Sequence, residues 1–373
     1  MMYPFSAEPH QNFQCKSCPC RCPQKLSHCT YPYQNDLGME AALLNPPHAA
    51  QSNLNLNVFN NDLSNTWNLL KTHDNTISSG NIIDQSDGLP PFTKPDNVST
   101  NINAHHQTIE DFNEGYLRIK GYDIRFVKHG HGPRALLFTY GVLGEIMNSF
   151  KKQLTAFDPD LFTSIFWDPP GYGKSIPRGR NYIPYQYIEE DVAIAHELLQ
   201  GLGISQVTLF GWCDGAHMSV LFSLRYPHMV HKLILWGTKA SLTRDNVQVF
   251  ERMRSLSSWS QMARSEVLKA YDNDVGYITG TFNQYVDAIN IMYKTCRGEL
   301  YKELLPFVQV PVLVLHAIDD MMVARHQVMD LKQQLADCRY YQFSSGGHSY
   351  HIKHCKEFNQ VCLNFIMEEN MFF

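Results

Sequence analysis

Short apolar runs alternate with amphipathic stretches along most of the chain. The runs predict strands at residues 116–120, 122–128, 135–139, 161–167, 207–210, 232–236, 310–316 and 339–343. Apolar residues at helical spacing predict helices at residues 187–202, 216–225, 324–335 and 355–367. The first two strands alternate polar and apolar residues around Gly121, which predicts a hairpin. Strands that alternate with helices are typical of the α/β class, with a mostly parallel sheet covered on both faces.

Residues 241–306 interrupt this alternation, because they are mostly helical in pattern and rich in aromatic side chains. Their position between two strand–helix units predicts an inserted helical cap. Such an insertion could cover the carboxyl edge of the sheet, where open α/β sheets bind ligands. The alternative is ordinary helical decoration of the sheet.

Residues 1–105 have a different composition, dominated by Asn, Gln, Ser, Pro and His without a sustained apolar period. A segment of this kind cannot bury enough surface to offset its chain entropy. We therefore expect a disordered extension, with a short helix near residues 62–70, followed by one folded domain at residues 106–373.

The extension carries a cluster of cysteines, at Cys15, Cys18, Cys20, Cys22 and Cys29. Thiolates at these spacings could share a soft metal ion. A stable zinc site usually has a second, separated pair, and no such pair with a fitting spacer follows. We interpret the cluster as exposed thiols and expect no metal.

No apolar signal-peptide core precedes these cysteines, which argues against secretion and a disulfide framework. A reducing compartment is expected, the cytoplasm first. Residues 1–30 hold three basic side chains against one acid, Glu8, a weak likeness to a transit peptide. The mitochondrion is therefore the alternative.

Charge and hydropathy exclude two classes of partner. The net charge is −5 and no basic face stands out, so nucleic acid is not expected. No apolar stretch approaches the roughly 18–20 residues of a membrane-spanning helix, so no membrane span is expected. Hydrophobic residues make up 44% of the chain, enough for a sizeable core.

The segment with the most informative chemistry is Gly-Trp-Cys-Asp-Gly at residues 211–215, between a predicted strand and a predicted helix. This is the pattern of a nucleophile elbow, a sharp turn in which glycines relieve crowding around a raised central side chain. The central residue is Cys213. The amides and dipole of the following helix would face whatever Cys213 attacks.

A thiol nucleophile needs a base, and in elbow enzymes the partners follow in the order acid, then histidine. Asp319 and Asp320 both follow the strand at residues 310–316. His348 ends a Gly-rich loop after the strand at residues 339–343 and is the candidate base. His351 and His354 fall at or inside the last helix and are expected to be packing or surface residues.

Stabilising an oxyanion requires two N–H groups. The amide of Asp214, directly after the candidate nucleophile, is one candidate. The other is the amide of Val142, in the loop at residues 140–144 after the strand at residues 135–139. The alternative for this loop is a plain Gly-rich strand exit.

Residues 168–175 end in Gly-Lys-Ser, like a phosphate-binding loop. That motif requires a glycine five positions before its last glycine, and Asp168 stands there instead. We therefore interpret the segment as a structural turn and expect no nucleotide or other cofactor.

Several stretches of the chain resemble the biphenyl hydrolase-like proteins, or valacyclovir hydrolases, of the α/β-hydrolase superfamily. They are residues 141–144, 167–175, 209–215 and 225–237, together with residues 357–359. The likeness covers residues 110–373. It implies an α/β-hydrolase fold and hydrolysis of esters, including α-amino acid esters. It assigns the nucleophile to Cys213, the acid to Asp320 and the base to His348. It also assigns recognition of a substrate ammonium group to Asp214.

The chain departs from that family at two points. Cys213 replaces the family's serine, and Tyr140-Gly141 replaces Pro-Gly before the oxyanion loop. Dienelactone hydrolases, which are similar in fold, use a Cys-His-Asp triad. The sequence therefore predicts hydrolysis of small esters through a thioacyl-enzyme. The alternatives are an inactive member that binds a small ligand or a protein under the cap, and redox sensing at Cys213. The sequence identifies no partner for the extension.

Overall fold

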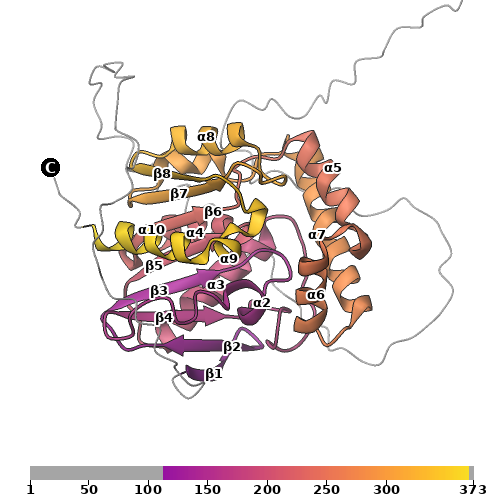
Figure 1. The fold of residues 1–373 in the computed structure, drawn as a ribbon. Helices are drawn as coiled ribbons and strands as arrows, with labels where there is room; N and C mark the ends of the chain where they lie inside the picture. Colours follow the sequence, from indigo (N-terminus) through magenta and orange to yellow (C-terminus); the bar gives the residue numbers. More distant parts are fainter. Residues whose placement is uncertain (1–111, 369–373) are drawn as a thin grey trace, which may run out of the picture. The chain divides into compact units, whose positions relative to one another are not determined.

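The computed structural model describes residues 112–368, and its centre is an eight-stranded sheet in the order β1-β2-β4-β3-β5-β6-β7-β8 (Figure 1). Strands β3 to β8 run parallel, while β2 is antiparallel to both β1 and β4. The strands are β1 (Phe112–Ile119), β2 (Tyr122–His129), β3 (Arg134–Thr139), β4 (Phe162–Trp167), β5 (Val207–Trp212), β6 (Val230–Trp236), β7 (Val312–Ala317) and β8 (Cys338–Phe343). The predicted α/β-hydrolase class is confirmed.

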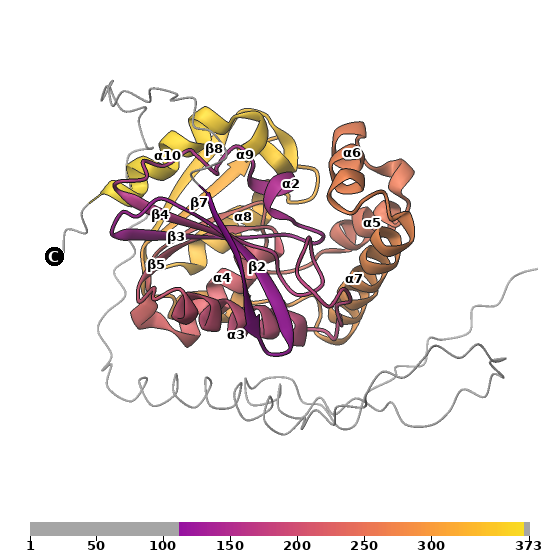
Figure 2. The same cartoon turned by 90° about the horizontal axis from the view of Figure 1, so that it is seen from below.

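Helices cover both faces of this sheet. Figure 2 shows α3 and α4 on one face, with α9 and α10 on the other. Because both faces are covered, every residue of β4 and of β7 is buried. The helices are α2 (Ile146–Phe150), α3 (Gln186–Gly201), α4 (Asp214–Arg225), α5 (Arg244–Met253), α6 (Gln261–Ala270), α7 (Val275–Thr295), α8 (Arg325–Gln334), α9 (Tyr350–Lys353) and α10 (Cys355–Met367).

Helices α5, α6 and α7 lie between β6 and β7 in the sequence and gather at one side of the sheet (Figures 1 and 2). The segment predicted as a helical cap is thus helical. Each helix has a side-chain cap at its N-terminus: Thr243 for α5, Ser260 for α6 and Asp274 for α7. Tyr285 of α7 lines the same cleft as Cys213, so the insertion reaches the candidate site.

Two local predictions differ from the structure. Strand β2 does not alternate, because Ile124, Arg125, Phe126 and Val127 are all buried. Strand β2 pairs with a strand on each side. The carboxylates of Glu145 and Asp168 neutralise the buried guanidinium of Arg125. Helix α4 begins at Asp214, two residues before the predicted start, because the elbow runs directly into the helix.

The structure bears on two further expectations. Within residues 112–368, no helix is long and apolar enough to cross a membrane. The expected disordered extension, its short helix and its cysteine cluster lie outside the described residues. The boundaries assigned to the folded domain and its cap stay predictions.

Candidate active site

Cys213 occupies a sharp turn between β5 and α4, with φ 57° and ψ −119°. The glycines on either side allow this turn to sit against the sheet. A Cβ on Gly211 would lie 2.6 Å from the Cα of Ala216, and one on Gly215 would lie 2.4 Å from the carbonyl carbon of Thr139. Only glycine fits at both places, so the spacing of the two glycines reflects close backbone approach.

Asp320 and His348 come together after β7 and β8. The Nδ1 of His348 lies 3.0 Å from Oδ2 and 3.3 Å from Oδ1 of Asp320. Backbone amides of Met322 and Val323 donate to the same carboxylate at 2.8 and 3.2 Å and fix its orientation. The neighbouring carboxylate, on Asp319, instead accepts hydrogen bonds from the glycine amides just before His348. Of the two candidate acids, the structure brings Asp320 to the histidine.

The electrostatics favour a charged His348. Burial disfavours the imidazolium, but the carboxylate of Asp320 and its hydrogen bond outweigh burial, with a smaller contribution from the neighbouring Cys213, and raise the pKa of His348 to about 10. Burial also raises the pKa of Asp320, yet His348 and the Met322 amide leave that pKa below its usual value. His348 is therefore oriented by Asp320, and its ring lies beside Trp212, the residue before Cys213.

The loop at residues 140–144 approaches the thiol directly. A Cβ on Gly141 would lie 2.9 Å from the Cβ and 3.3 Å from the Sγ of Cys213. The loop closes through a hydrogen bond from the Gly144 amide to the Gly141 carbonyl oxygen, at 3.0 Å. Among residues 112–368, neither the Val142 amide nor the Asp214 amide donates to another backbone group. Both candidate oxyanion donors are thus uncommitted to the backbone.

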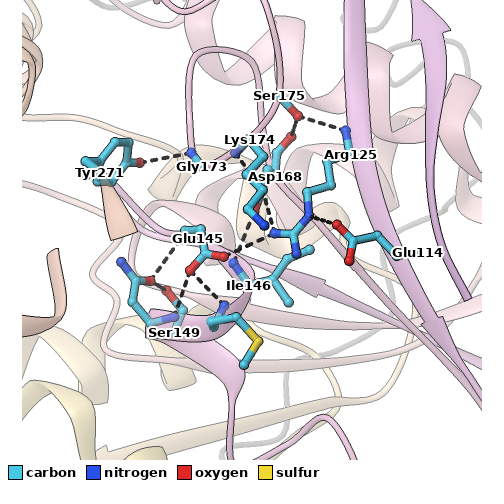
Figure 3. A network of polar contacts seen from close by, with 12 residues as sticks. Glu114, Arg125, Glu145, Ile146, Ser149, Asp168, Gly173, Lys174, Ser175 and Tyr271 are labelled. Carbon is cyan, nitrogen blue, oxygen red and sulfur yellow. Dashed lines mark hydrogen bonds and ion pairs between the residues drawn. The ribbon is translucent and has the colours of Figure 1, made fainter. Parts of the chain in front are cut away.

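A buried ion network holds this loop (Figure 3). Arg125 of β2 donates to Glu145 and to Asp168, each at 3.1 Å, and to Glu114 at 2.7 Å. Glu145 caps α2, and Asp168 accepts a hydrogen bond from the amide of Ile146. Both carboxylates therefore fix the position of the segment that follows the loop. Burial and Glu145 raise the pKa of Asp168 to about 6, against the opposing effect of Arg125.

Asp168 also organises its own turn. Its carboxylate accepts the Lys174 amide at 2.9 Å, and its carbonyl oxygen accepts the hydroxyl of Ser175 at 2.6 Å. A Cβ on Gly173, which has φ +50°, would lie 2.3 Å from the Asp168 carboxylate. Residues 168–175 thus form a tight turn held by their own hydrogen bonds, as predicted.

A cleft of about 340 Å³, part of it open to solvent, adjoins the thiol. It is lined by Cys213, Asp214, His217, Lys239, Tyr285 and Tyr301, among others. The side chain of Asp214 faces two phenols, because Tyr187 of α3 donates to it at 3.2 Å and Tyr285 of α7 at 3.1 Å. Burial raises the pKa of Asp214, although Lys239 and the two tyrosines act in the opposite direction.

The sequence interpretation missed several polar residues of this cleft, among them Tyr187, His217, Lys239 and Tyr285. Lys239 follows β6 by three residues, so its place at the carboxyl end of a parallel strand was a usable signal. His217 lies one turn after the candidate nucleophile on α4. The tyrosines come from distant helices, and no local pattern connects them with the elbow.

The remaining histidines near the site have separate roles. His351 is buried, accepts the indole N–H of Trp236 and faces the carbonyl oxygen of Ser149. His354 lies beside the hydroxyl of Ser345. Within the described part of the chain, no group of three His, Cys, Asp or Glu side chains is placed to hold a metal ion.

Comparisons with known proteins agree with this geometry. A family described as "alpha/beta hydrolase fold" matches residues 134–264. Serine hydrolase BPHL of mouse is 31% identical over 250 residues, covering 67% of this chain and 85% of that protein. The chain belongs to the α/β-hydrolase family. Human serine hydrolase BPHL matches to the same extent.

More distant α/β hydrolases share the fold. A 2-hydroxy-6-oxononadienedioate/2-hydroxy-6-oxononatrienedioate hydrolase of Pseudomonas is 23% identical, over 66% of this chain and 88% of its own length. The solved structure of 2-hydroxy-6-oxo-6-phenylhexa-2,4-dienoate hydrolase from Rhodococcus superposes with a TM-score of 0.59 at 14% identity. It covers 69% of this chain and 99% of its own. The expected resemblance to biphenyl hydrolase-like proteins therefore holds, within a hydrolase fold shared more widely.

Proposed function

We propose that the protein hydrolyses small carboxylic esters through a Cys213–His348–Asp320 triad. The observation that carries this proposal is the hydrogen bond between His348 Nδ1 and the Asp320 carboxylate, in a loop whose His348 ring packs against Trp212, the residue before the elbow cysteine. An elbow cysteine paired with an oriented histidine is the arrangement of an activated thiol nucleophile. The uncommitted amides of Val142 and Asp214 supply the oxyanion hole.

The reaction has two halves. His348 holds the proton of the thiol, and the Cys213 thiolate attacks the ester carbonyl carbon to give a tetrahedral oxyanion. Collapse breaks the bond to the alkoxide, which takes the proton from His348, and leaves a thioester on Cys213. The neutral imidazole then takes a proton from water as hydroxide attacks the thioester. Collapse releases the acid, and the thiolate–imidazolium pair returns.

The cleft supports a small acyl group, because bulky side chains such as Tyr187, Tyr285 and Tyr301 line it. The resemblance to valacyclovir hydrolases extends the candidates to α-amino acid esters, with Asp214 as receptor for the ammonium group. The Pseudomonas relative, in contrast, is named for its action on dioates, which carry negative charge. The charge of the acyl group therefore depends on which charged side chains line the cleft.

The test is hydrolysis of 4-nitrophenyl acetate, 4-nitrophenyl butyrate and valine benzyl ester by the full chain. We expect turnover that Cys213→Ala abolishes, together with an acyl mass increment on Cys213 during turnover. Cys296→Ala, which removes a half-exposed thiol after α7, is the matched control and should retain activity. Hydrolysis that survives Cys213→Ala would contradict the proposal. Ligand binding without turnover would favour a non-enzymatic member of the family.

A further inference from the structure

Lys239 places an ammonium group in the wall of the candidate active-site cleft. It follows β6, is only 6% exposed, and lines the same cleft as Cys213. Its Nζ lies 5.1 Å from the ring centroid of Phe250 in α5. Among residues 112–368, no carboxylate oxygen lies within 4.0 Å of this ammonium. Lysine is rarely buried to this degree without a partner, so the charge lacks the direct neutralisation that burial ordinarily requires.

The nearest carboxylates are engaged elsewhere. Asp214 accepts hydrogen bonds from the hydroxyls of Tyr187 and Tyr285. Asp320 is bound to His348 and to two backbone amides. Lys239 is close enough to both carboxylates to lower their pKa values, yet it forms a salt bridge with neither. The cleft therefore offers a cation that is free to pair with an anionic ligand.

A second polar group lies in the same cleft. His217 is on α4, one turn after Cys213, with its ring stacked on Tyr301 at 4.7 Å between centroids. Burial lowers its pKa to about 3, so the imidazole is neutral at physiological pH. A neutral imidazole can donate one N–H to an acceptor without adding charge. Lys239 and His217 together suit an anionic group with oxygen acceptors.

We propose that the cleft accepts an acyl group that ends in a carboxylate, with Lys239 as its receptor and His217 as a second donor. The substrate class is then the monoester of a small dicarboxylic acid. This inference rests on the proposed hydrolase function, in which the cleft beside Cys213 receives the acyl group. An ammonium group in the wall of that cleft repels a substrate ammonium, so the inference disfavours the α-amino acid esters that the family resemblance suggests.

The test compares 4-nitrophenyl hydrogen glutarate with 4-nitrophenyl valerate, which has a methyl group in place of the carboxylate. We expect the full chain to prefer the glutarate ester in kcat/KM. Lys239→Gln should reduce that preference about 10- to 100-fold, the range for a hydrogen bond to a charged group. Lys239→Arg should retain most of the preference. Lys356→Gln, an exposed lysine of α10, is the matched control and should leave it unchanged.

Three other outcomes are decisive. The protein could hydrolyse both esters without preferring the glutarate ester, or Lys239→Gln could leave that preference intact. Either result would overturn the role of Lys239 while the hydrolase function stands. If neither ester is hydrolysed, calorimetric titration with glutarate and valerate decides. The protein could bind glutarate more tightly than valerate, and Lys239→Gln could abolish that binding. This result would support the carboxylate site without the hydrolase function. Absence of glutarate binding would refute the site. Thermal unfolding of each variant identifies those that fail to fold.

Discussion

The indole nitrogen of Trp212 donates a hydrogen bond to the backbone carbonyl oxygen of His348, at 3.1 Å. Trp212 directly precedes Cys213, while His348 comes from a loop 136 residues later. The two rings also pack together, with centroids 5.6 Å apart. The distance between the candidate nucleophile and base is thus set by a contact outside the triad.

Trp212→Phe should keep the packing and lose this hydrogen bond. We expect kcat to fall about 2- to 10-fold, the range for one neutral hydrogen bond, with little change in KM. Steady-state kinetics on a 4-nitrophenyl ester would measure both. Trp259→Phe is the matched control, because it removes an indole bond to the carbonyl oxygen of Met253 in the cap. Equal losses in the two variants would show that the Trp212 contact has no special role.

Asp320→Asn should lower the pKa of His348 from about 10 toward its ordinary value, because the carboxylate is what stabilises the imidazolium. We expect kcat/KM to fall by about 10,000-fold, since the imidazole loses both its orientation and its counter-charge. NMR titration of the His348 ring would measure the pKa. Asp319→Asn is the control and should leave that pKa near 10; a fall of similar size there would contradict the assignment of the acid.

The same pair makes the stability of the protein depend on pH. The raised pKa of His348 means that its contribution is fully present below about pH 6.5 and declines as the pH rises toward 10. The lowered pKa of Asp320 means that its contribution is lost as the pH falls below 3.8. The difference in unfolding free energy between the wild type and Asp320→Asn should therefore shrink from pH 6.5 to pH 10. Denaturant unfolding at several pH values would measure it, and a constant difference would exclude this linkage.

Gly141→Ala should obstruct the thiol, because the added methyl group would lie 2.9 Å from the Cβ and 3.3 Å from the Sγ of Cys213. We expect iodoacetamide to alkylate Cys213 about 10-fold more slowly, and ester hydrolysis to fall at least as far. Overpacking should also lower the unfolding free energy by about 1–3 kcal/mol. Gly280→Ala on α7, where a Cβ meets nothing within 4 Å, should keep both rates. Unchanged alkylation in Gly141→Ala would mean that the loop does not crowd the sulfur.

Arg125→Met should destabilise the fold by about 3–5 kcal/mol, because it leaves the buried carboxylates of Glu145 and Asp168 without their cation. Denaturant unfolding would measure the change. Arg118→Met is the comparison, because the Arg118–Asp123 pair has side chains 65% and 37% exposed and should contribute less than about 1 kcal/mol. Similar losses of unfolding free energy in both variants would mean that the buried network stabilises the fold no more than the exposed pair does.

The sequence was most informative where function imposes a backbone requirement. The elbow at Cys213 could be found because its turn demands glycines at fixed spacing. His348 could be found from its place after the last strand. The choice between Asp319 and Asp320 depended on family resemblance, since both follow the same strand. The structure separates them through hydrogen bonds to different partners.

What the sequence did not predict arises from long-range packing. The expected alternation of β2 was wrong at Arg125, because Glu145 and Asp168 reach it from 20 and 43 residues away. Tyr285 meets Asp214 across 71 residues of chain. Neither contact leaves a periodic trace in the local sequence. The residues that the sequence did not predict line the cleft or hold the neighbouring loop in place, and none of them belongs to the triad.

The residues of the candidate site enter the chain in a fixed order during synthesis. The loop at residues 140–144 comes first, Cys213 later and His348 last. While the polypeptide is being made, Cys213 has no base, since the histidine that would take its proton has yet to be translated. A nascent or truncated chain that ends before β8 would carry Cys213 without its candidate base. The chemistry proposed for this protein is therefore confined to chains that extend beyond His348.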